Sequence, residues 1–121
     1  MQRYTDLRVW ERAHALALEI YRTSAGFPDQ ERFGLSAQLR RAVVSVPTNI
    51  VEGSKRQSAQ EFARFLNIAE ASLAETGYLL MLSRDLGYLE AAVAKAQMAE
   101  VDEIAAMLHA LRSKVQESRG A

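Results

Sequence analysis

The chain has no cysteine, only two prolines and no excess of charge of either sign, since its 121 residues include 15 basic and 15 acidic side chains. Without cysteine it can form neither a disulfide framework nor a thiolate zinc site, and this suits a reducing compartment. A net charge of zero removes the strongest compositional sign of a nucleic-acid-binding protein, a basic domain. Because 49% of the residues are hydrophobic, we expect one folded domain over residues 1–121.

Long apolar runs are absent as well. Charged residues interrupt the first 25 positions, so no signal-peptide core is present, and no run approaches the roughly 20 apolar residues that span a bilayer. We therefore expect a soluble cytoplasmic protein that has no membrane partner.

Helical periodicity is what the sequence does contain. Four segments show apolar residues at three- and four-residue spacing, over about 6–25, 34–53, 58–86 and 90–117. Asp6 is a candidate cap for the first segment, and Ser58 with Glu61 forms a capping box before the third. Because the second, third and fourth segments are joined by links of about three or four residues, neighbouring helices must run antiparallel. The sequence predicts an all-α, up-down four-helix bundle.

Pro47 lies inside the second segment. A proline there removes one backbone donor and leaves the carbonyl of Val43 without its helical partner, so we expect this helix to be kinked at Pro47. Asn49 and Glu52 are placed to satisfy the backbone groups that the proline frees.

The first and third segments contain more apolar residues than one core face requires. Ten of the fifteen residues from 7 to 21 are apolar, and so are fourteen of the twenty-one from 62 to 82. One interpretation is a wide core; the other is a second buried face in a homo-oligomer, because monomers rarely expose large apolar patches. The candidate interface residues are Val9, Ala13, Leu16, Ile20, Phe65, Ile68 and Leu79.

Catalytic and metal-binding patterns are incomplete. Glu11 and His14 have the E-x-x-H spacing of di-iron bundles, but His109 has no glutamate three residues before it, so half of the ligand set is missing. Two histidines without cysteine or a nucleophile elbow give no catalytic triad. We therefore expect no catalytic residues, metal or other cofactor, and a protein that is not an enzyme.

Charge is unevenly distributed along the chain. Residues 32–64 contain six basic and two acidic side chains, a net charge of +4, whereas residues 65–110 contain two basic and seven acidic ones, a net charge of −5. A basic cluster can bind nucleic acid even in a neutral protein. A solvated face with internal ion pairs, or contact between oppositely charged subunit faces, would explain the same pattern.

The central part of the chain resembles one known family, the four-helix-bundle proteins encoded in 23S rRNA intervening sequences, also labelled S23 ribosomal proteins. The resemblance covers about residues 5–90. It rests on the residues 6–10 (DLRVW), Tyr21, Phe27-Pro28, Glu31, Gly34-Leu35, Gln38, Arg40 to Ala42, Ser45, Pro47, Asn49-Ile50, Glu52-Gly53, Phe62, Phe65-Leu66 and Ala69.

This family is similar to the accessory variability proteins of diversity-generating retroelements, which are pentameric helical bundles that associate with a reverse transcriptase and nucleic acid. The resemblance therefore implies a homopentamer with a possible RNA, DNA or reverse-transcriptase partner. Its candidates for contact with a polyanion are Arg40, Arg41, Lys55 and Arg56. The hypothesis is a non-enzymatic, oligomeric scaffold associated with nucleic acid, and its alternative is a protein-assembly module that binds no nucleic acid.

Overall fold

A computed structural model describes residues 7–119, which form four α-helices and one short 3-10 turn. The elements are α1 (Arg8–Ser24), η2 (Asp29–Glu31), α2 (Leu35–Ser54), α3 (Ala59–Asp85) and α4 (Ala91–Arg119). Each α-helix lies within two residues of its predicted bounds, and the all-α prediction is confirmed. The proposed cap Asp6 lies outside the described residues.

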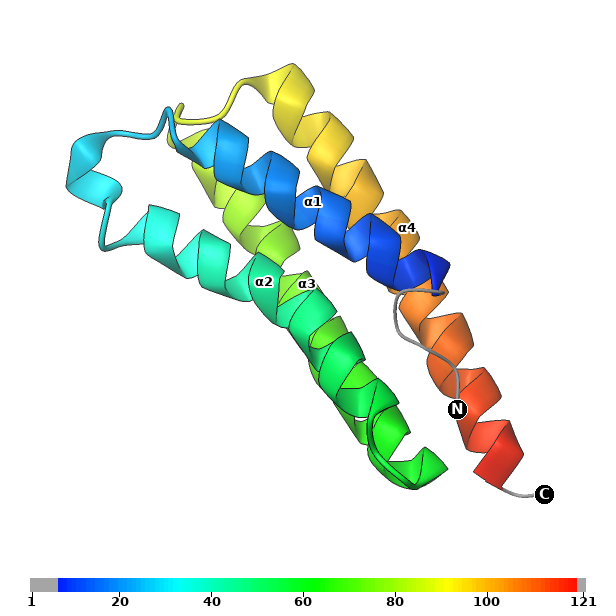
Figure 1. Ribbon diagram of the computed structural model, residues 1–121. Coiled ribbons are helices and arrows are strands. Elements are labelled where there is room, and N and C mark those ends of the chain that lie inside the picture. The colour runs from blue at the N-terminus through cyan, green and yellow to red at the C-terminus, as the bar shows by residue number, and fades with distance from the viewer. Residues whose placement is uncertain (1–6, 120–121) are drawn as a thin grey trace.

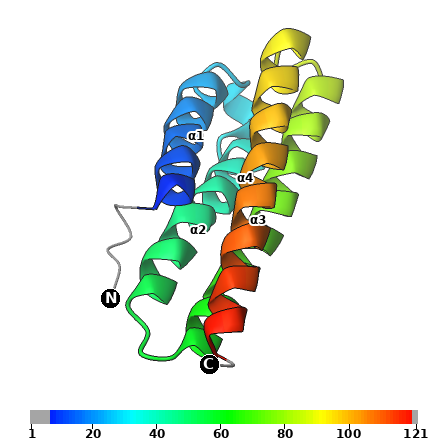
Figure 2. The same cartoon turned by 90° about the vertical axis from the view of Figure 1, so that its right-hand side faces the viewer.

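The helices run alternately up and down, and each packs beside its neighbours in the chain (Figures 1 and 2). The last helix, α4, also contacts the first, α1, which closes the bundle. The contact of α1 with α4 is the smallest of the four. With 17 residues against 27 and 29 in α3 and α4, α1 covers only the upper part of the bundle in Figure 2. One long side of the bundle is therefore less fully covered than the others.

Local sequence signals set the helix ends. The Ser58 hydroxyl accepts a hydrogen bond from the backbone N–H of Glu61 at 3.1 Å, as its capping box predicts. At the other end of α3, Gly87 adopts φ +81°, and the backbone N–H groups of Gly87 and Tyr88 donate to the carbonyls of Arg84 and Ser83. This is a Schellman motif, which needs a left-handed residue that glycine adopts without strain.

A carboxylate ties the two connections at the upper end of the bundle together. Glu31 accepts one hydrogen bond from the backbone N–H of Leu35 at 3.2 Å and another from the Tyr88 hydroxyl at 3.0 Å. Gly34 leaves room for it, because a Cβ there would lie 2.8 Å from the Glu31 carboxylate. The start of α2 is thereby fixed against the loop between α3 and α4.

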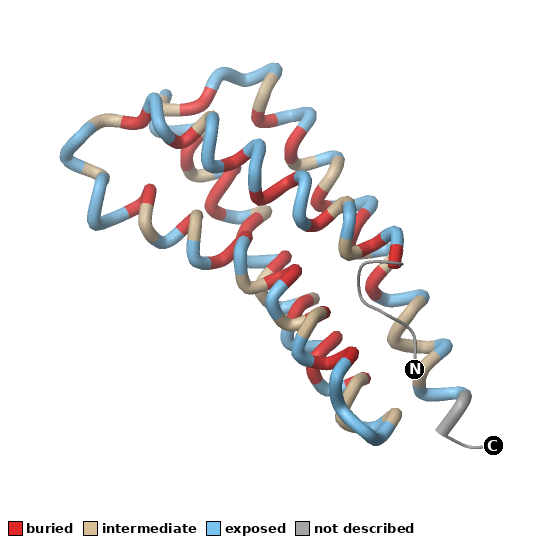
Figure 3. Tube along the Cα trace, viewed as in Figure 1, coloured by how far each residue is buried: buried red, intermediate tan, exposed pale blue. Residues whose placement is uncertain are grey.

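The core runs along the inward faces of all four helices (Figure 3). Two glycines let neighbouring helices approach closely: a Cβ on Gly53 would lie 2.8 Å from Cβ of Phe65, and one on Gly77 would lie 3.3 Å from a methyl group of Val101. At Gly77, α3 is thus in close contact with α4 of the same chain.

Pro47 lies within α2, which stays α-helical from Leu35 to Ser54. Side chains of the next turn bond to nearby carbonyls: the Thr48 hydroxyl donates to Val44 O at 2.7 Å and the Asn49 amide to Ser45 O at 2.8 Å. Asn49 was expected to satisfy the carbonyl of Val43, which Pro47 leaves without its helical partner, but its amide bonds the carbonyl of Ser45 instead. The Glu52 carboxylate instead pairs with the guanidinium of Arg56, one turn later in the chain. The kink itself stays a prediction.

Candidate functional site

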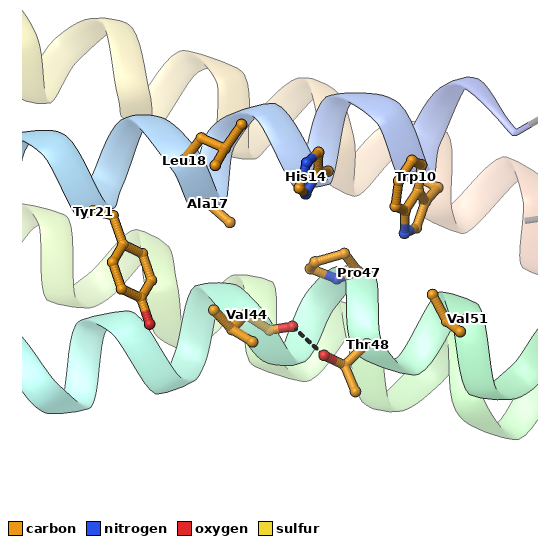
Figure 4. Close-up of a pocket in the computed structure, with 9 residues that line it drawn as sticks. All are labelled: Trp10, His14, Ala17, Leu18, Tyr21, Val44, Pro47, Thr48 and Val51. Carbon is orange, nitrogen blue, oxygen red and sulfur yellow. Dashed lines mark hydrogen bonds between the residues drawn. The ribbon is translucent and has the colours of Figure 1, made fainter. Parts of the chain in front are cut away.

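An apolar groove lies between α1 and α2 on the outside of the bundle, with a volume of about 440 Å³ (Figure 4). Trp10 and Tyr21 reach from α1 toward α2 near its two ends, and Pro47 lies between them. The residues that line the groove are Trp10, His14, Ala17, Leu18, Tyr21, Val44, Pro47, Thr48 and Val51.

Several of these apolar side chains are open to solvent, and this separates the groove from the core. Leu18 is 44% exposed, Tyr21 45% and Val44 38%. The Trp10 and His14 rings stack at 5.1 Å with an interplanar angle of 5°, which holds the indole along the groove. The Arg40 guanidinium lies 4.7 Å from the centre of the Tyr21 ring and fixes the other end.

Polar contacts set the rotation of α1 in the bundle. The Arg12 guanidinium donates to both carboxylate oxygens of Glu100, at 2.6 and 2.9 Å, and to Glu103 at 3.1 Å. These hydrogen bonds raise the pKa of Arg12 far above its ordinary value. Arg112 pairs with Glu70 in the same way between α4 and α3, and its pKa is raised as well. With Arg12 turned toward α4, the Trp10 side of α1 faces α2 and solvent.

The predicted oligomer-interface residues lie mostly inside the protomer. Val9, Ala13, Leu16, Ile20, Phe65 and Leu79 are all at most 8% exposed, and of the seven only Ile68, at 37%, reaches the surface. This corrects the assignment of the two apolar stripes of α1: the stripe of Val9, Ala13, Leu16 and Ile20, which was expected to meet a partner, packs against the chain's own helices. The other stripe, which includes Trp10 and Tyr21, lines the groove.

The four predicted polyanion contacts do not form one patch. Arg40 and Arg41 lie near the start of α2 and Lys55 and Arg56 just after its end, about 20 Å apart at 1.5 Å per residue. Arg40 is engaged inside the protein, because its Nε donates to the Ser24 hydroxyl at 2.8 Å. Arg41 lies in a depression between α2 and α3 that also holds an acidic side chain, that of Glu75.

Lys55 and Arg56 instead share a basic corner with Arg64, where α2 turns into α3. The guanidinium groups of Arg56 and Arg64 each lie 4.7 Å from the centre of the Phe65 ring. Arg64 also hydrogen-bonds the carboxylate of Glu61, which lowers the pKa of Glu61 and raises that of Arg64. The ring and the ion pair hold these two cations in fixed positions at the surface.

The E-x-x-H pair of Glu11 and His14 lies in no cluster of potential metal ligands within the described chain. His14 stacks on Trp10, and within residues 7–119 no group of three or more His, Asp or Glu side chains could hold a metal ion. In the same part of the chain, no helix is both long enough and apolar enough to cross a membrane.

The groove was not predicted as a site from the sequence. Leu18, Val44 and Val51 were not among its candidates, although Leu18 was counted in the apolar surplus of residues 7–21. This surplus of apolar residues was the one signal in the sequence that indicated a second apolar face on the first helix. Its two stripes could not be told apart before the helix partners were known.

Comparison with known proteins settles the family. The family model for the 23S rRNA-intervening sequence protein matches residues 5–110. The chain belongs to this family. No curated protein matches it. Among solved structures, this intervening-sequence protein is similar to a protein of unknown function from the S23 ribosomal protein family of Bacteroides thetaiotaomicron VPI-5482, solved at 1.70 Å. The two chains are 25% identical, the match covers 87% of this chain and 95% of the other, and the TM-score is 0.80.

Proposed function

We propose that the protein is a non-enzymatic scaffold that assembles with copies of itself, using the groove between α1 and α2 as one half of the subunit contact. The observation that carries this proposal is the exposure of Leu18, Tyr21 and Val44 side by side along the groove. Clustered apolar surface of this kind is typical of interaction sites.

The other half of the contact is the outer face of α4. Its exposed positions include alanines at helical spacing with one lysine and two carboxylates among them: Ala92, Lys95, Ala96, Ala99, Asp102, Glu103, Ala106 and Ala110. A helix face with small side chains can sit deep in an apolar groove. Asp102 complements the charge of Arg41, which is exposed on α2, and of Lys55, which is exposed just after the end of that helix; α2 forms one wall of the groove.

A contact between two different faces of the same chain is head-to-tail, and such contacts close into rings when the rotation between subunits permits. A homopentamer is a ring of this type, and it is the stoichiometry that we propose. Because the groove and the outer face of α4 belong to different sides of the bundle, each protomer can offer both at once.

Native mass spectrometry tests the assembly. We expect the wild-type mass to be five times that of the protomer, and Leu18→Glu to yield monomers by placing a charge in the groove opposite Asp102. Leu86→Glu is the matched control, because Leu86 is 50% exposed at the end of α3, away from the groove. A monomeric wild type rejects the assembly. A wild-type mass retained in Leu18→Glu but lost in Ile68→Glu places the contact on α3 instead.

Association with nucleic acid is a second candidate function, favoured by the basic corner of Lys55, Arg56 and Arg64. Arginines held flat on an aromatic ring present their donors to phosphate in a fixed orientation. The ion pairs of Arg56 with Glu52 and Arg64 with Glu61 reduce the net charge of the corner, so we expect weak, salt-sensitive binding. A reverse-transcriptase partner would use the same assembled scaffold.

Fluorescence anisotropy with labelled RNA and DNA at two salt concentrations tests this function. Replacing Arg56 and Arg64 by Gln together should weaken binding and reduce the salt slope by about two. Arg84→Gln is the control, since this arginine lies at the far end of α3. If binding is absent, or does not change in the double variant, the alternative of an assembly module without nucleic acid is favoured.

A further inference from the structure

A polar pocket of about 310 Å³ lies between α3 and α4, beside the first turns of α3 and the last turns of α4. Its volume falls within the range of about 300–1,000 Å³ that is typical of ligand pockets. Three residues with amide side chains, two arginines, one glutamate and one alanine line it. We call it the amide pocket. It lies on a different side of the molecule from the groove between α1 and α2.

The three amide side chains have no partner within the protein. They belong to Gln60 and Asn67 of α3 and to Gln116 of α4, and all three residues are exposed. Within residues 7–119, no other group hydrogen-bonds any of these carboxamides. A carboxamide carries a donor and an acceptor side by side, which is the pattern that matches the edge of a nucleobase. The pocket therefore offers several groups of this kind to one ligand.

The two arginines of the pocket are held in place by carboxylates. Arg112 pairs with Glu70, and Arg64 pairs with Glu61. Glu61 is the one acidic side chain among the described residues that line the pocket, so the charges of the lining sum to +1. A planar guanidinium is a stacking surface for a base, and one that is already held in position loses little freedom when the base binds.

The amide pocket adjoins the basic corner, because Arg64 belongs to both. Arg56 cannot lie far from Arg64, since each guanidinium lies 4.7 Å from the centre of the same Phe65 ring. Groups suited to phosphate and groups suited to a base edge are therefore neighbours on one surface. A nucleotide whose phosphate contacts Arg56 can place its base in the pocket.

We propose that the amide pocket binds an unpaired base of single-stranded RNA or DNA, and that it prefers adenine. The base stacks on the guanidinium of Arg64, and the carboxamides of Asn67 and Gln116 hydrogen-bond its edge from two helices. Adenine is preferred because a carboxamide pairs with its N6 and N7 through two hydrogen bonds. A duplex binds less well, because its bases must first leave the stack. This inference rests on the proposed association with nucleic acid, and adds to it a base contact and a preference for single strands.

Fluorescence anisotropy with three labelled single strands of equal length tests the pocket. One strand carries adenines, one carries uracils, and the third is abasic, so that only its sugars and phosphates remain. We expect the wild type to bind the adenine strand about tenfold more tightly than the abasic strand. The uracil strand should bind less tightly than the adenine strand.

A double variant with Asn67→Ala and Gln116→Ala should abolish the preference for adenine and leave the affinity for the abasic strand unchanged. Because it removes no charge, the dependence of binding on salt should also stay unchanged, whereas replacing Arg56 and Arg64 reduces it. Gln57→Ala is the matched control, since Gln57 is an exposed glutamine near the same end of the bundle that does not line the pocket. All three positions are exposed, so the unfolding temperatures should not fall.

The inference is overturned if the wild type binds the adenine strand no more tightly than the uracil or abasic strand, or if Gln57→Ala removes the preference as fully as the double variant does. The abasic strand separates this failure from that of the proposed function. Binding of all three strands with equal affinity removes the base pocket and leaves the association with nucleic acid standing. A wild type that binds none of the strands removes both.

Discussion

The close approach of α2 to α3 at Gly53 gives a quantitative test of the bundle's packing. In Gly53→Ala, the new Cβ would lie 2.8 Å from Cβ of Phe65 and 2.9 Å from the ring of Phe62. Attractive carbon–carbon contact begins near about 3.5 Å. The Phe62 ring can turn aside, but Cβ of Phe65 is fixed to the backbone of α3. The two helices must therefore separate by about 0.7 Å at this point.

Two effects of opposite sign decide the magnitude. Overpacking of this kind costs about 1–3 kcal/mol, and we expect the upper half of that range because the obstacle is attached to a backbone. Replacing a helical glycine by alanine stabilises the folded state by about 1 kcal/mol. The net loss should be about 1–2 kcal/mol, which lowers the unfolding temperature by about 4–8 °C in a chain of this size.

Gly77→Ala is the matched control, because it gains the same helix propensity but meets only a side-chain methyl group of Val101 at 3.3 Å. We expect its free energy of unfolding to be unchanged or raised by up to about 1 kcal/mol. Urea unfolding of both variants at one protein concentration gives the comparison. Equal stability of the two variants would refute the close packing of α2 on α3 at Gly53.

Three further predictions concern the ends of α3. Gly87→Ala should lower the free energy of unfolding by about 1–2 kcal/mol in thermal unfolding, because alanine is strained at the positive φ of the Schellman motif; a φ-tolerant Gly87→Asn should lose less. Tyr88→Phe should cost about 1 kcal/mol in urea unfolding by removing the bond that its hydroxyl donates to the upper loop, and Tyr78→Phe, exposed on α3, should cost nothing. The hydrogen bond from Arg64 lowers the pKa of Glu61 below its ordinary 4.5, so this pair stabilises the fold above that pH and loses its effect as the pH falls. Unfolding temperatures measured from pH 7 to 3 should therefore fall less steeply in Glu61→Gln, and identical pH profiles would contradict the pairing.

The number of helices and their bounds could be predicted because the signals are local. Helix ends depend on a few adjacent residues, such as Ser58 with Glu61 and the glycine after α3, and helical period depends only on spacing along one segment. The role predicted for Asn49 beside Pro47 was wrong, because its amide finds the carbonyl of Ser45 one turn earlier and not the carbonyl of Val43. Glu52 was predicted wrongly there because its carboxylate only accepts hydrogen bonds, and it pairs with Arg56 one turn later.

The candidate site was far less predictable. The sequence determined that α1 has two apolar stripes, that the chain is neutral and all-helical, and that basic and acidic residues are segregated. Only the tertiary structure decided that Val9 faces the core while Leu18 faces the groove. The rotation of α1 is set by the pairing of Arg12 with Glu100 and Glu103 of α4, which lie far from it in the sequence. An apolar or hydroxyl side chain carries no mark of what will surround it, since burial and hydrogen bonding are properties of the packed chain.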